Sequence, residues 1–99
     1  MTQEEKKAAM KDLFEIRAGM IEDSIRLYKE SDGLFCIGND TEREIHISST
    51  RWNEVVDAMQ PVVTYDPNWD ERFPKIMAYF YVELSGNKYK VFTLLNKEG

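Results

Sequence analysis

The stretch that decides the fold is "AYFYVELSGNKYKVFTLL", residues 78–95. Two runs rich in aromatic and β-branched residues flank the turn-forming pair Gly86-Asn87, and this combination predicts a β-hairpin. With the turn at that pair, Leu84 is expected opposite Tyr89, and Tyr81 opposite Phe92. Because side chains alternate between the two faces of a strand, each residue of the hairpin can be assigned to a face.

Both faces of the predicted hairpin are apolar. The first face carries Ala78, Phe80, Val82, Leu84, Val91 and Leu95, and the second carries Met77, Tyr79, Tyr81, Phe92 and Leu94. A sheet with helices on one side normally presents polar residues to water on the other side. Three explanations remain open: two helices cover opposite faces of the sheet, the chain forms a homodimer through the second face, or this face docks another protein.

The segments before the hairpin predict one helix and three short strands. The helix is expected from Gln3 to about Ala18, because apolar residues recur at helical spacing behind a capping residue, Thr2, and Gly19 stands near the end. The strands are expected as an antiparallel meander formed by "SIRLYKE" (24–30), "LFCI" (34–37) and "EIHIS" (44–48).

A second helix is predicted directly after the third strand. Ser48 or Ser49 can cap it, and its apolar face consists of Trp52, Val55, Val56 and Met59. Pro61 ends it, and residues 61–74 are expected to form a long loop. The chain is therefore predicted to be a single α+β domain over residues 1–99, in the order α-β-β-β-α-β-β, with an antiparallel sheet and helices packed on it.

Charge and cysteine content exclude several classes of protein. The 99 residues carry a formal net charge of -5, with 18 acidic and 13 basic side chains spread along the chain. Without a basic cluster, direct contact with nucleic acid or an anionic membrane is not expected. One cysteine, Cys36, cannot form an intramolecular disulfide, and no apolar run approaches the roughly 20 residues of a membrane span. We therefore expect a cytoplasmic protein.

The sequence predicts no catalytic, metal or cofactor site. His46, the only histidine, alternates with Ile45 and Ile47 and is expected to point outward. A catalytic histidine needs a carboxylate or a nucleophile within reach, and a metal site needs several converging ligands. The stretch "DPNWD", residues 66–70, begins like a calcium-binding loop, but Glu71 stands where that loop requires glycine.

The predicted function is that of a small, acidic, non-enzymatic protein-binding or accessory module. Its recognition surface is expected to be the second, aromatic sheet face together with the 66–72 loop. The candidate partner-binding residues are Tyr28, His46, Trp69, Met77, Tyr79, Tyr81, Phe92 and Leu94. One alternative is an acidic inhibitor of the kind that phages and mobile elements encode, which occupies the nucleic-acid-binding cleft of a partner protein. A second alternative is a small-molecule-binding or catalytic domain.

Overall fold

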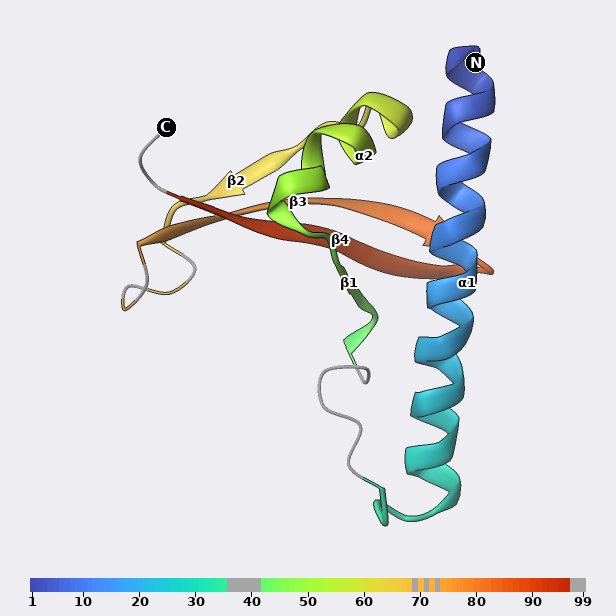
Figure 1. Ribbon diagram of the computed structural model, residues 1–99. Coiled ribbons are helices and arrows are strands. Elements are labelled where there is room, and N and C mark those ends of the chain that lie inside the picture. Colours follow the sequence, from blue (N-terminus) through green and yellow to red (C-terminus); the bar gives the residue numbers. More distant parts are fainter. Residues whose placement is uncertain (36–41, 69, 71, 73, 97–99) are drawn as a thin grey trace.

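The computed structural model describes residues 1–35, 42–68, 70, 72 and 74–96, and it has the α+β class that the sequence predicts (Figure 1). The elements are α1 (Gln3–Glu30), β1 (Glu44–His46), a 3-10 turn (Ser49–Arg51), α2 (Trp52–Met59), β2 (Thr64–Asp66), β3 (Lys75–Leu84) and β4 (Asn87–Asn96).

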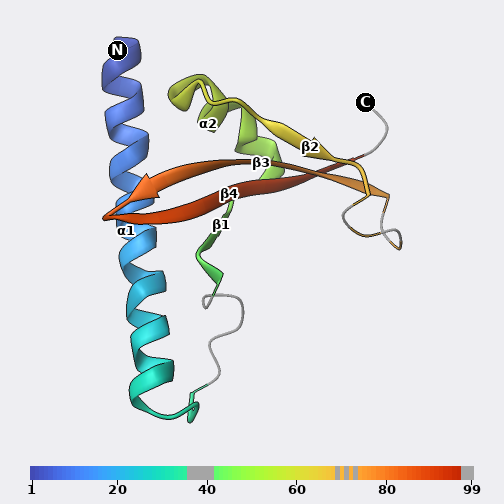
Figure 2. The same cartoon turned by 180° about the vertical axis from the view of Figure 1, so that it is seen from behind.

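The four strands form one mixed sheet in the order β1-β4-β3-β2. β4 pairs antiparallel with β3, and β3 pairs antiparallel with β2, but β1 runs parallel to β4. The expectation of a purely antiparallel sheet is therefore wrong. Figures 1 and 2 show α1 and α2 on the same side of the sheet, so the explanation in which the two helices cover opposite faces is also wrong. We call the helix-covered side the inner face and the other side the outer face.

Helix α1 is longer than the sequence predicted. It begins at the expected cap, Thr2, whose hydroxyl accepts a hydrogen bond from the backbone N–H of Glu5. It then continues to Glu30, so residues 24–30 are helical, and the strand predicted there is wrong. Phe14, Ala18 and Ile21 are buried at intervals of four and three residues, and this helical spacing carries the helix through Gly19.

The other predicted elements are partly corrected. Leu34 and Phe35 are exposed and lie outside any strand, whereas the remainder of the predicted strand 34–37 lies outside the described residues. The strand at residues 44–48 is confirmed as β1, but it pairs with β4 and not within a meander. The segment 61–74 is not only a loop, because it contains β2.

The start of the second helix also differs from the expectation. The chain enters α2 through the 3-10 turn, and the side chain of Ser48 caps no backbone N–H group. Its hydroxyl instead forms a 2.9 Å hydrogen bond with the hydroxyl of Thr50. The predicted apolar face of the helix is confirmed, since Trp52, Val55 and Met59 are buried.

The hairpin has a different register from the predicted one. Leu84 pairs with Asn87, so the two-residue loop is Ser85-Gly86. Both loop residues have positive φ angles, 50° and 82°, as the turn that matches the strand twist requires. The observed pairing is shifted by two residues from the predicted one, since Leu84 is opposite Asn87 and not Tyr89. Because side chains alternate with a period of two, every side chain stays on its predicted face.

The core lies between the inner face of the sheet and the two helices. Its buried hydrophobic members are Phe14, Ala18, Ile21, Ile45, Trp52, Val55, Met59, Ala78, Phe80, Leu84, Tyr89 and Val91. The hydroxyl of Thr93 donates a 2.7 Å hydrogen bond to the carbonyl of Ile47 and so ties β4 to the chain after β1. At the other end, the side chain of Gln3 donates to the carbonyls of Asp57 and Ala58 and ties α1 to α2.

A polar cluster joins the middle of α1 to the sheet. The hydroxyl of the buried Tyr89 donates to the carboxylate of Glu22, which also accepts two hydrogen bonds, at 2.7 and 2.8 Å, from the guanidinium of Arg43. The hydrogen bonds from Arg43 and Tyr89 hold the pKa of Glu22 below its ordinary value. Burial and the neighbouring Glu22 raise the pKa of Tyr89 to about 12.

Glu22→Gln is expected to lower the free energy of unfolding by about 1 kcal/mol at neutral pH, because it removes charge-assisted hydrogen bonds at a partly solvated site. A carboxylate whose pKa is depressed in the folded state stabilises the fold above its unfolded pKa and loses that contribution as the pH falls. The free energy of unfolding, measured in urea, should therefore differ less between wild type and variant as the pH falls below about 4.3, the ordinary pKa of glutamate. A difference that does not change between pH 7 and pH 3 would contradict this role.

Candidate functional site

The outer face of the sheet is the candidate functional site. The strand registers place these residues on it: Glu44, His46, Thr64, Asp66, Met77, Tyr79, Tyr81, Glu83, Lys88, Lys90, Phe92 and Leu94. Figure 2, which looks at the molecule from behind, shows this side of the sheet with no helix in front of it. Among the described residues, no helix therefore covers the aromatic hairpin face.

Aromatic side chains contact one another across this face. The rings of His46 and Phe92 are stacked, with centroids 4.6 Å apart, so β1 adds its imidazole to the aromatic surface of β4. Tyr79 and Tyr81 meet edge to face on β3, with centroids 5.7 Å apart. Tyr81 is 52% exposed, and its amphipathic ring is the kind of side chain that anchors a protein interface.

Two lysines lie over these tyrosines. The ammonium of Lys88 is 4.1 Å from the ring centroid of Tyr81, and that of Lys90 is 4.6 Å from the ring centroid of Tyr79. The ammonium of Lys90 also lies 3.9 Å from the carboxylate of Glu44. Burial raises the pKa of Glu44, so this carboxylate gains a proton at a higher pH than an exposed glutamate does. The middle of the outer face thus combines tyrosine rings with two lysines and with the carboxylates of Glu44 and Glu83.

The structure brings six of the eight predicted site residues together, namely His46, Met77, Tyr79, Tyr81, Phe92 and Leu94. Tyr28 is not among them, because it lies in the last turns of α1, beside Gly33. Trp69 lies outside the described residues. Lys88 and Lys90 were not among the predicted site residues: the sequence places Lys90 on this face opposite Glu83, whereas the observed register pairs Glu83 with Lys88.

The acidic 66–72 loop uses its described carboxylates to hold its own backbone. Asp66 accepts a 3.0 Å hydrogen bond from the backbone N–H of Asn68, and Asp70 accepts a 2.9 Å one from that of Arg72. These are the local contacts of Asx turns. Within the described ranges, no three histidine, cysteine or acidic side chains are grouped so that they could hold a metal ion.

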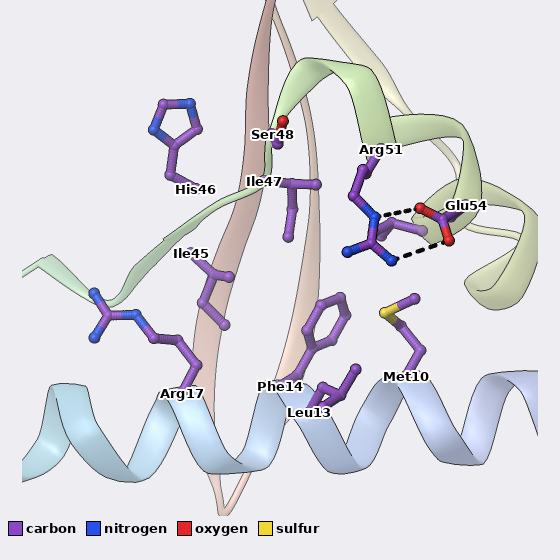
Figure 3. A pocket seen from close by; sticks show the side chains of 11 residues that line it. Met10, Leu13, Phe14, Arg17, Ile45, His46, Ile47, Ser48, Arg51 and Glu54 are labelled. Carbon is purple, nitrogen blue, oxygen red and sulfur yellow. Dashed lines mark hydrogen bonds and ion pairs between the residues drawn. The ribbon is translucent and has the colours of Figure 1, made fainter.

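A groove of about 330 Å³ lies on the helix side of the molecule (Figure 3). Its wall on α1 includes Met10, Leu13 and Phe14, and the ion pair of Arg51 with Glu54 borders the opposite side. The imidazole of His46 points away from these apolar side chains in Figure 3, in keeping with its stacking on the outer face. The groove can hold an apolar side chain, and the described residues that line it bring no acid–base pair against a nucleophile.

Comparisons with known proteins add no family. No family model matches the chain, and searches of curated proteins and of solved structures find no significant match. In the part of the chain that the structure describes, no helix combines the length and the apolar character that crossing a membrane requires.

Proposed function

We propose that this chain is a non-enzymatic protein-binding module that docks a partner protein on the outer face of its sheet. The observation that carries the proposal is that both helices lie on the inner face, which leaves the aromatic side chains of β3 and β4 facing solvent. An uncovered apolar patch rimmed by polar residues is typical of interaction sites on soluble proteins.

The size of the face suits such an interaction. β3 and β4 have ten residues each, and at about 3.3 Å per residue they give the face a length of about 33 Å. A stable interface buries roughly 800 Å² on each partner; two strands about 4.8 Å apart and this long span roughly 300 Å², and the outer faces of β1 and β2 add to that area.

The charge of the face indicates the chemistry of the partner. Lys88 and Lys90 lie directly over the tyrosine rings, so the fitting surface combines apolar side chains with carboxylates near them. Two lysines at the centre of the face do not favour the alternative of an acidic inhibitor that imitates nucleic acid, since such a surface would present carboxylates alone. We also propose that the protein acts in the cytoplasm, because a chain with a single cysteine, Cys36, has no intramolecular disulfide of the kind common in secreted proteins.

Tyr81→Glu is expected to weaken partner binding by at least tenfold, because it replaces the exposed ring of Tyr81 with a carboxylate that the partner would have to bury beside the half-buried rings of Tyr79 and Phe92. Far-ultraviolet circular dichroism should stay unchanged, since the side chain is half exposed. The matched control is Tyr65→Glu. Tyr65 is 60% exposed and pairs with Ala78, so its side chain projects from the opposite side of the sheet.

The measurement is affinity purification from cells of the source organism, with wild type, Tyr81→Glu and Tyr65→Glu as baits. We expect wild type and Tyr65→Glu to retain the same proteins in equal amounts and Tyr81→Glu to lose them. Equal retention by all three baits would contradict docking on the outer face. Loss by both variants would also contradict it, because the effect would then not be specific to this face.

A further inference from the structure

The second half of β3 has an open edge. Leu84 and Asn87 close a two-residue hairpin and therefore exchange both backbone hydrogen bonds, and such pairs alternate along an antiparallel ladder. The even-numbered residues of β3 thus bond to β4, and the odd-numbered ones direct their N–H and C=O groups to the other edge. The same alternation holds in β4. The N–H of Lys90 donates to the carbonyl of Arg43, just before β1, and the carbonyl of Phe92 accepts from the N–H of Ile47, just after β1.

Strand β2 occupies only part of that edge. It pairs with Met77 to Tyr79 and leaves the backbone groups of Tyr81 and Glu83 without a strand partner among the described residues. In the register of β2 with β3, Val62 would stand opposite Tyr81 and Gln60 opposite Glu83, but β2 begins only at Thr64 and Gln60 is the left-handed C-cap of α2. Two donors and two acceptors therefore face outward at residues 81 and 83.

A groove of about 410 Å³ runs beside this edge. It is lined by Lys7, Lys11, Met59, Gln60, Pro61, Phe80, Tyr81, Val82 and Glu83. Figure 1 shows how α1, the end of α2 and the second half of β3 surround the same region. The groove therefore offers an extended segment both a backbone to pair with and a wall of side chains.

Two unpaired cations stand at the groove. Lys7 and Lys11 are one helical turn apart on α1, and no described acidic side chain forms an ion pair with either of them. Their neighbour Lys6, by contrast, pairs with Asp57 at 3.2 Å. Because α1 lies on the inner face, these two ammonium groups stand on the inner side of any strand added at the edge.

We propose that this groove binds an extended acidic segment of a partner protein, which adds to the sheet as a strand beside Tyr81 and Glu83. Side chains of an added strand alternate, so the segment would direct carboxylates inward to Lys7 and Lys11 and apolar side chains outward beside the ring of Tyr81. This site shares Tyr81 with the outer face, but it uses the backbone edge of β3 and two lysines of α1, and it does not depend on the docking proposed there.

The test uses two labelled peptides with blocked ends, Asp-Val-Asp-Val-Asp-Val and Lys-Val-Lys-Val-Lys-Val, and measures their binding by fluorescence anisotropy at low ionic strength. Wild type is expected to bind the aspartate peptide at least tenfold more tightly than the lysine peptide. Glu83→Pro removes one outward N–H group at an edge position that tolerates proline, so it should weaken binding of the aspartate peptide at least tenfold. The matched control, Glu83→Ala, keeps that N–H group and removes a negative charge, so it should bind as tightly as wild type or more tightly.

The charge of the groove is tested by a double variant, Lys7→Glu with Lys11→Glu, which should weaken binding of the aspartate peptide at least tenfold. Equal binding of the two peptides by wild type would overturn the proposal. Equal binding of the aspartate peptide by Glu83→Pro and Glu83→Ala would overturn strand addition at this edge.

Amide exchange gives a readout on the wild-type protein, which is needed if Glu83→Pro does not fold. The amides of Tyr81 and Glu83 should exchange fast in the free protein, whereas those of Val82 and Leu84 should exchange slowly. Saturation with the aspartate peptide should slow the exchange at residues 81 and 83 at least tenfold. Unchanged exchange at both residues would overturn the proposal.

Discussion

Trp52→Ala should lower the free energy of unfolding by about 3–5 kcal/mol, the usual cost of deleting a buried aromatic side chain. Trp52 is 3% exposed, stands at the first position of α2, and packs against Phe80 of β3 with ring centroids 5.7 Å apart. Its removal leaves a cavity at the contact between helix and sheet. Urea unfolding followed by far-ultraviolet circular dichroism measures the loss, because the signal does not depend on the tryptophan itself.

Val62→Ala is the matched control for this prediction. Val62 is 92% exposed, so its truncation should change the free energy of unfolding by less than about 0.5 kcal/mol. If the losses for Trp52→Ala and Val62→Ala are similar, α2 is not packed on the sheet as described.

Ile21→Ala should lower the free energy of unfolding by about 2–5 kcal/mol. Ile21 is fully buried, and it lies beyond the point at which the sequence predicted the end of the first helix. The adjacent Met20 is 57% exposed, so Met20→Ala serves as the control and should cost less than about 1 kcal/mol. Equal losses for the two variants would contradict an α1 that continues past Gly19 with Ile21 turned toward the sheet.

The elements that the sequence predicted correctly are those set by local chemistry. Thr2 and Glu5 form a capping box at the start of α1, and the apolar spacing from Trp52 to Met59 identifies α2. The hairpin and its two faces follow from alternation and from the turn around Gly86. In each case the signal lies within a few neighbouring residues.

The elements that it missed depend on contacts distant in the sequence. Ile25 and Leu27 alternate with polar residues as in a strand, but Ile25 also continues the helical spacing of Ile21. Ile25 packs against the core together with Ile21, and this tertiary contact stabilises the helix over the strand. β2 is three residues long, and only its pairing with β3 identifies it. The parallel pairing of β1 with β4 joins segments more than 40 residues apart, for which local patterns carry no signal.

The candidate site divides in the same way. Alternation in the hairpin was sufficient to place Tyr79, Tyr81 and Phe92 on one face, and alternation around His46 placed the imidazole outward. That the face is uncovered could not be predicted, because the sequence does not state on which side of the sheet each helix packs. The unpaired edge at residues 81 and 83 also depends on where β2 begins, which is a property of the folded chain.

The most direct test of an open outer face is the absolute mass of the protein in solution, measured by light scattering on a size-exclusion peak. Concentrations from about 10 to 500 μM are used, because mass action makes weak self-association visible over this range. The wild type and Tyr81→Glu are both predicted to have the mass of one chain throughout, because the face is kept for a different protein. A wild type with the mass of two chains that Tyr81→Glu reduces to one would contradict the account, since the face would then be occupied by a second copy.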